Sequence, residues 1–239
     1  DPKNFVNNFS GNIIYKKNKI YKSDLVSTFP NNKKLNLTIN TNENNEKITT
    51  IYSENPKPLL SSYKFIKGFE EGVLDFYSVK RNNVSESVLK ISDFKIQEVP
   101  VLAKLLTLAS LQGIADLLTG EGIRFDDFEL KFTSKDKLMR IDELYAIGPA
   151  ISIMMEGYIE KNNLISLKGT LVPATTINRT IASIPLLGNI LVGKKVGEGV
   201  FGVSFKIKGP KDKLKTTVNP IKTLTPRFIT RTLENLKIN

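Results

Sequence analysis

Apolar and polar residues alternate along most of this chain, and that period of two residues restricts the fold more than any other feature. A strand with one buried face places every second side chain on the same side of its sheet. The clearest run covers residues 200 to 208, where Phe201, Val203, Phe205 and Ile207 fall on one side. Shorter runs contain Leu35, Leu37 and Ile39, then Ile151, Ile153 and Met155, then Ile165, Leu167 and Leu171. The pattern predicts many β-strands.

Polar turn signals separate these runs and indicate how the strands connect. The signals are Asn31-Asn32, Asn42 to Asn45, Asn82-Asn83, Lys135-Asp136 and Asn162-Asn163. Asn and Asp favour tight turns because they tolerate left-handed backbone conformations. Between residues 88 and 96 the apolar phase slips, which predicts a β-bulge near Ser92 and Asp93. We therefore expect a mainly β, α+β fold built on an antiparallel meander.

Helical patterning interrupts the strands at a few places. The longest segment runs from Val99 to Leu118, with a break expected at Gly113, and Lys104 and Asp116 make it a poor transmembrane span. Shorter helices are expected over residues 57–66 and 175–184, and a last one from Thr225. The apolar stripe of the last helix fits packing on the sheet, and it also fits lying on a membrane surface.

Missing residue types exclude many enzyme chemistries. The chain has no cysteine and no histidine, which removes thiolate nucleophiles, imidazole proton transfer, disulfides and nearly every zinc site. Asp126, Asp127 and Glu129 are candidates for acid-base work or a hard-metal site. Asp127 and Glu129, however, share one face of a predicted strand opposite Phe128 and Leu130, as solvated acids do. We predict a non-enzymatic protein with no catalytic residue, cofactor or metal.

Two glycine-containing segments resemble nucleotide-binding motifs without the required surroundings. Gly197, Gly199 and Gly202 spell G-x-G-x-x-G, but they precede a strand instead of opening a helix. Residues 188–195 approach the P-loop pattern, yet Lys195 stands where a Ser or Thr would bind magnesium. We do not expect nucleotide binding.

The net charge of +11 is concentrated near one end of the chain. Residues 191 to 239 contain 11 Lys or Arg against 3 Asp or Glu. Such a basic segment can attract phosphate on anionic lipid or nucleic acid, although a solvated surface explains it equally well. Nucleic-acid binding usually needs exposed aromatics among the basic residues, whereas Phe201 and Phe205 alternate on a side expected to be buried. No nucleic-acid partner is expected.

From Val88 onward, a succession of segments resembles one bacterial family. In order, they are LKISDFKIQEVPVLAKLLTLASLQGIADLLTGEGIRFDDFELKF, LISLKGTLVPA, IPLLGNILVG, GEGVFGVSFKIKGP and TTVNPIKTLTPRFI. This succession resembles the AsmA-like C-terminal family of envelope proteins, which includes the AsmA, TamB and YhdP types. The earlier TTIYSENPKPLLSSYKFIKGFEEGVLDFY resembles the segment that precedes that domain. The Lys-rich positions 194, 195, 211, 213 and 215 depart from the family.

The resemblance implies an architecture and a role but no active residues. It divides the chain into a β-rich segment, 1–87, and an AsmA-like C-terminal domain, 88–239. It implies a curved antiparallel β-sheet with an apolar inner face, several amphipathic helices and a C-terminal helix. The protein would lie in the periplasm, anchored to the inner membrane by a segment outside this chain, and would conduct phospholipids between two membranes.

Candidate contact residues follow from combining that role with the alternation. The expected lipid contacts are Ile151, Ile153, Ile165, Leu167, Phe201, Val203, Phe205 and Ile207. The expected contacts with a membrane surface, or with an outer-membrane or periplasmic protein, are Lys194, Lys195, Arg227, Phe228 and Arg231.

Three alternatives stay open at the level of sequence. The apolar side chains of the strands also suit an ordinary closed core under the segment from Val99 to Leu118. In that case the chain would suit a periplasmic scaffold that assists outer-membrane assembly. The basic segment 191–239 would also suit a peripheral binder of anionic membrane or nucleic acid.

Overall fold

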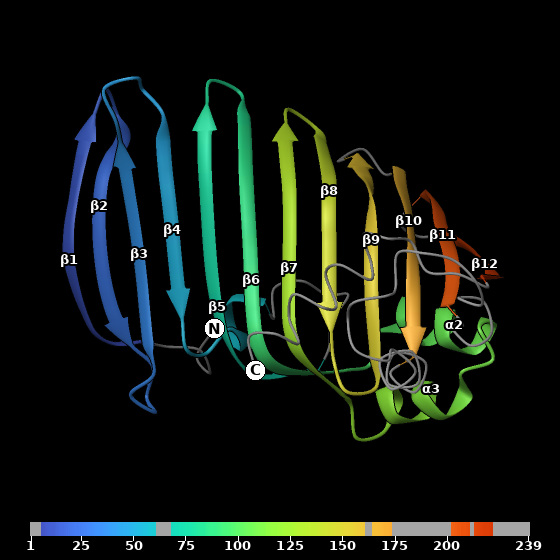
Figure 1. Ribbon diagram of the computed structural model, residues 1–239. Coiled ribbons are helices and arrows are strands. Elements are labelled where there is room, and N and C mark those ends of the chain that lie inside the picture. Colours follow the sequence, from blue (N-terminus) through green and yellow to red (C-terminus); the bar gives the residue numbers. More distant parts are fainter. Residues whose placement is uncertain (1–5, 61–67, 161–163, 174–201, 211–212, 222–239) are drawn as a thin grey trace, which may run out of the picture.

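The computed structural model describes residues 6–60, 68–160, 164–173, 202–210 and 213–221. These residues form one curved, unclosed, antiparallel sheet of twelve strands with few helices (Figure 1). The strands are β1 (Asn7–Lys16), β2 (Lys19–Thr28), β3 (Lys34–Thr41), β4 (Lys47–Ser53), β5 (Gly68–Arg81), β6 (Val84–Gln97), β7 (Ile123–Lys135), β8 (Leu138–Ile147), β9 (Ile151–Glu160), β10 (Leu164–Pro173), β11 (Gly202–Pro210) and β12 (Lys215–Ile221). The helices are α1 (Lys57–Leu60), α2 (Pro100–Leu108) and α3 (Gln112–Thr119).

Strand order in the sheet is the order in the sequence, from β1 to β12, which confirms the predicted meander. The predicted turn residues are where the chain reverses. Asn32, Asn45, Asn82 and Asp136 all have positive φ angles, between 52° and 61°. Side chains other than Asn and Asp rarely adopt that conformation without strain. The predicted turn at Asn162-Asn163 lies outside the described residues.

The predicted phase slip in β6 is present, but it is not a β-bulge, because the pairing register with β5 and with β7 is the same on both sides of it. Asp93 has φ +52°, and the hydrogen-bonded register with β5 and β7 skips it. Across β5, Gly72 with φ +90° is skipped in the same way. This reorientation lets both Ile91 and Phe94 reach the same core, because the side-chain phase shifts between them.

The segment from Val99 to Leu118 forms two helices, but the expected break at Gly113 was wrong. The chain breaks at Ser110, which has φ +59°. The amide of Leu111 donates to the carbonyl of Leu106, and the amide of Ser110 donates to that of Thr107. These bonds form a Schellman motif, which satisfies the free carbonyls at the end of α2. Gly113 lies within α3 instead.

The position of α2 shows that the sheet bends toward the helices. This helix begins three residues after β6 ends, and it contacts β12. Six strand spacings would separate β6 from β12 by about 29 Å in a flat sheet. A nine-residue helix is only about 14 Å long. The sheet must therefore curl around the helix pair, and β10 to β12 are turned away from the plane of the earlier strands in Figure 1.

The main core lies between the helices and β5 to β11. The ring of Phe94 stacks on Phe69 at 5.3 Å and on Phe125 at 5.5 Å, and it meets Phe128 edge-on at 6.2 Å. Helix side chains cover this cluster, with Leu106 and Leu118 fully buried. Burying aromatic and leucine side chains together is the largest favourable contribution to a fold of this kind.

Several predicted elements cannot be compared with the structure. Of the helix expected over 57–66, the described part is α1, and residues 61–67 lie outside the description. The helices expected over 175–184 and from Thr225 also lie outside it, as do the glycine-rich residues 188–199. The expected division at residue 87 falls inside β6, and the sheet continues through it.

Candidate functional site

One face of the sheet carries a continuous row of apolar residues and glycines. Cross-strand partners in an antiparallel sheet point to the same face, so the pairing register defines the row. It consists of Gly11, Leu25, Leu37, Ile51, Phe76, Leu89, Leu130, Leu144, Met155, Gly169, Phe205 and Val218. We call this the Leu37 row, and the side on which it lies the Leu37 face.

The next row on the Leu37 face is also mostly apolar. It contains Leu35, Leu74, Ile91, Phe128, Ala146, Ile153, Leu171 and Val203, with Ser27 and Ser53 at its β2 and β4 positions. The hydroxyl of Ser27 donates to the carbonyl of Leu35. Ser27 therefore contributes no free polar group to this face.

The opposite face carries ion pairs. Lys131 lies 2.7 Å from Glu129 and 3.7 Å from Glu143, and Lys90 lies 3.4 Å from Glu129. Farther along the sheet, Lys168 and Glu156 are 2.9 Å apart. The pairing register thus places these ion pairs and the two mostly apolar rows on opposite faces of the sheet.

The Leu37 face is covered over one part of the sheet and open over another. Among the described residues, the hydrophobic core under α2 and α3 takes side chains from β4 to β12 and none from β1, β2 or β3. Leu25, Leu37 and Ile39 are half-buried. By contrast, Phe125 and Leu171 are 1% exposed. Within the described ranges, the same face is therefore a packed core over the later strands and lies outside that core over β1 to β3.

The predicted lipid-contact residues that the structure describes all lie on the Leu37 face, but four are enclosed. Ile151, Val203, Phe205 and Ile207 are between 0% and 4% exposed. Ile153, Ile165 and Leu167 are half-buried. The sequence grouped these side chains correctly on one face, and the helix pair covers the part of the face where most of them lie. Acyl chains could reach Ile151, Phe205 and Ile207 only if α2 and α3 moved.

The other predicted contacts lie outside the described residues. These are Phe201 among the lipid contacts and Lys194, Lys195, Arg227, Phe228 and Arg231 among the membrane or partner contacts. Within the described ranges, no helix has both the length and the apolar character needed to cross a bilayer.

The acidic cluster in β7 has the arrangement expected of surface residues. Asp127 and Glu129 point away from Phe128 and Leu130, and Glu129 pairs with Lys131. Partial burial, and then repulsion from Asp126, raises the pKa of Asp127. In the described part of the chain, no group of acidic residues is arranged to hold a metal ion.

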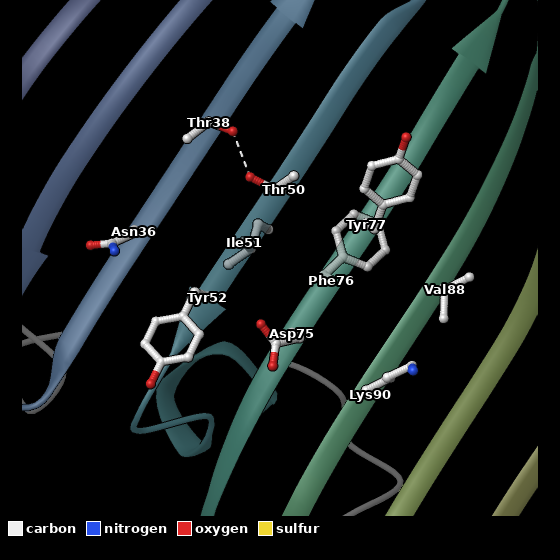
Figure 2. Close-up of a pocket in the computed structure, with 10 residues that line it drawn as sticks. All are labelled: Asn36, Thr38, Thr50, Ile51, Tyr52, Asp75, Phe76, Tyr77, Val88 and Lys90. Carbon is white, nitrogen blue, oxygen red and sulfur yellow. Dashed lines mark hydrogen bonds between the residues drawn. The ribbon is translucent and has the colours of Figure 1, made fainter.

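Sequence reasoning missed a hollow on the face opposite the Leu37 row. Figure 2 shows its side chains on β3 to β6, with Tyr52 and Tyr77 at opposite ends and Asp75 between them. The hollow is open to solvent and has a volume of about 490 Å³. Its residues come from four strands, so only the register brings them together. The signal in the sequence was the alternation of Tyr52 with Ile51 and of Tyr77 with Phe76, which sends the tyrosines to the opposite face.

Comparison with known proteins identifies no relative: no family model, curated protein or solved structure matches the chain. The resemblance to the AsmA-like family therefore stays a prediction from the sequence.

Proposed function

We propose that this chain is part of a bacterial envelope protein that conducts phospholipids along the Leu37 face, which acts as an apolar inner wall. In this proposal, acyl chains lie against β1 to β4, headgroups remain in water at the open side, and the amphipathic helices α2 and α3 close the far end. The protein would be periplasmic and attached to the inner membrane. The supporting observation is the Leu37 row, which crosses every strand of a sheet that is curved and unclosed.

Physical considerations favour acyl chains as the occupant of this wall. Sheltering a methylene group from water contributes about 0.8 kcal/mol, so even a few methylenes per strand give a useful affinity. The binding is also non-directional, because apolar contact does not depend on register or orientation. A molecule held in this way can slide along the wall, whereas hydrogen bonds would fix it in place.

The open part of the wall has the polarity that this role requires. Leu25, Leu37 and Ile51 follow one another across β2, β3 and β4 and are all half-buried. Half-burial leaves part of each side chain for a ligand to cover. The buried hydroxyls of Ser27 and Ser53 take part in hydrogen bonds with the backbone of Leu35 and Asn55. They do not compete for a lipid headgroup.

A second candidate is a periplasmic scaffold that binds an envelope protein and assists outer-membrane assembly. The observation that favours it is the covered part of the Leu37 face, where Ile151, Val203 and Phe205 are enclosed in the protein's own core. A scaffold needs a stable body and no accessible wall. Under this reading, the half-buried leucines of β2 and β3 would contact a protein partner.

Photocrosslinking in living cells tests the first proposal. A benzophenone amino acid at Leu37 should capture phospholipid, because position 37 lies on the open part of the wall. The matched control is Asn40, which lies on the same strand but on the opposite face and is exposed. Equal capture at the two positions, or capture at Asn40 alone, would contradict the proposal.

Native mass spectrometry then distinguishes the two candidates. Co-purified phospholipid that is lost in a Leu37→Asp, Ile51→Asp double variant supports conduction. A lipid-free chain bound to a protein partner in a fixed ratio supports the scaffold. Because both replaced side chains are half-buried, circular dichroism of the variant checks that the sheet is intact.

A further inference from the structure

The hollow opposite the Leu37 row combines aromatic rings with hydrogen-bonding groups. Asp75 is the register partner of Tyr52, and Tyr77 is the partner of Thr50, so the two rings are diagonal neighbours on β4 and β5. Tyr77 is 47% exposed. The hydroxyls of Thr38 and Thr50 hydrogen-bond to each other beside the rings (Figure 2). The floor therefore offers apolar ring surface beside polar atoms.

One end of the hollow is held in place by a chain of hydrogen bonds. The hydroxyl of Tyr52 donates to Glu54 at 3.1 Å, and Glu54 accepts from the backbone amide of Lys34 at 2.8 Å. Partial burial, and then the bond to Glu54, raises the pKa of Tyr52. Because its hydroxyl is fixed at the rim, the ring of Tyr52 is ordered before any ligand arrives.

The charges in the hollow favour a neutral ligand. Lys90 is the register partner of Asp75, but it forms its ion pair with Glu129 on the next strand. Among the described residues, Asp75 has no hydrogen bond or ion pair. A polyanion such as nucleic acid would meet the carboxylate of Asp75, and a cation would meet the ammonium of Lys90. A ligand with many hydroxyl groups and no charge can donate to Asp75 and accept from Lys90 at the same time.

We propose that this hollow binds a neutral, unbranched oligosaccharide, with sugar rings stacked on Tyr77 and Tyr52. One side of a pyranose ring presents C–H groups that pack on an aromatic face, while its hydroxyls point outward. Asp75, Lys90 and Thr50 are placed to bond those hydroxyls. The openness of the hollow suits a chain that continues beyond it at both ends. This proposal does not depend on lipid conduction, because it uses the opposite face.

Titration followed by amide NMR tests the proposal, with cellotetraose and chitotetraose as the two neutral probes. Binding of either probe in the millimolar range should shift the amides of β4 and β5 around Tyr52 and Tyr77. Tyr77→Ala should weaken that binding by about tenfold or more, whereas Tyr77→Phe should keep it because the ring remains. Tyr77 is largely exposed, so neither variant should unfold the sheet.

The control variant is Tyr15→Ala, which removes a tyrosine that is 64% exposed and lies on β1, outside the hollow. It should leave the binding unchanged. The proposal is overturned if neither probe shifts the β4 and β5 amides, if Tyr77→Ala binds as tightly as the unaltered chain, or if Tyr15→Ala weakens binding equally. Tighter binding of a polyanionic probe, such as heparin, in the same hollow would also overturn it.

Discussion

The first four strands and the last eight show the same alternation of side chains, yet the Leu37 face differs in burial between the two sets. On the Leu37 face, β2 to β4 have half-buried leucines and isoleucines, and Ile13 of β1 is exposed. Among the described residues, no helix core lies above β1 to β3. In β5 to β12, the side chains of α2 and α3 pack against the same face. Alternation therefore specifies which side chains share a face, and a separate segment decides whether that face becomes a core.

The difference arises from where the helices enter the chain. They lie between β6 and β7, so they emerge at the middle of the sheet and can cover only what its curvature brings to them. The amide of Glu98 donates a hydrogen bond to the carbonyl of Leu118, which connects the end of α3 to the end of β6. The contact of α2 with β12 then places the helix pair over the later strands.

The largest expected effect of this difference is on stability. Leu106→Ala should lower the free energy of unfolding by about 3 to 5 kcal/mol, because Leu106 is 0% exposed and its removal leaves a cavity. Leu37→Ala should cost about 1 kcal/mol or less, since water already reaches the half-buried side chain. Urea unfolding of both variants measures the two values.

Leu108→Ala is the control for helix propensity, because Leu108 lies on α2 but is 46% exposed. It should change the unfolding free energy by only about 0.5 kcal/mol. Equal losses for Leu106→Ala and Leu37→Ala would show that the two parts of the Leu37 face are buried alike.

A smaller effect is expected from two glycines, Gly169 in the covered part of the sheet and the exposed Gly113 on the covering helix α3. A Cβ at Gly169 would lie 2.6 Å from the ring of Phe205 and 2.3 Å from the carbonyl oxygen of Met154. Gly169→Ala should therefore destabilise the protein by about 1 to 3 kcal/mol. Gly113→Ala should stabilise it by about 0.5 to 1 kcal/mol, because no atom lies within 4 Å and α3 gains helix propensity. Thermal unfolding of the pair should give shifts of opposite sign.

The smallest expected effect is a difference in acid titration between the two parts. A hydrogen bond from the backbone of Lys34 lowers the pKa of Glu54 in the open part, whereas desolvation raises that of Asp127 in the later part. The stabilisation by Glu54 is complete above its ordinary pKa of 4.5 and is lost as pH falls through the lower folded value. For Asp127, the charged form is disfavoured, and that penalty is relieved as pH falls through its raised pKa.

Carboxyl carbon NMR measures both midpoints. Glu54 should titrate below 4.5 and Asp127 above its ordinary 3.8. In Glu54→Gln, stability should depend less on pH in the acid range than in the unaltered chain. A Glu54 midpoint at or above 4.5 would contradict the hydrogen-bonded geometry at the rim of the hollow.

Local signals in the sequence were sufficient for the meander, the turns and the phase slip in β6. Each depends on a few neighbouring residues, such as Asn82 at a reversal or the phase slip around Asp93. The helix break was misplaced for a physical reason. Glycine is the residue type that most often ends a helix, which favoured Gly113. In the structure, Ser110 adopts the left-handed conformation instead, and the amide of Leu111 donates a hydrogen bond to the carbonyl of Leu106.

The candidate sites were less accessible to sequence reasoning because they depend on contacts between distant residues. Alternation placed Phe205 and Ile207 on one face correctly, but it could not show that α2 and α3, much earlier in the chain, cover them. The hollow with Tyr52 and Tyr77 depends on the register of four strands, and a shift of one residue would send each ring to the other face.

Because each strand pairs only with its neighbours in sequence, the sheet has no closure that fixes its size. Loss or duplication of a two-strand hairpin leaves every remaining strand running in the same direction, because each hairpin reverses the chain twice. The side chains of the remaining strands also stay on the same faces of the sheet. Among the described residues, β1 to β3 contribute no side chain to the core under α2 and α3, so the sheet can lengthen or shorten by pairs of strands at this edge without repacking that core.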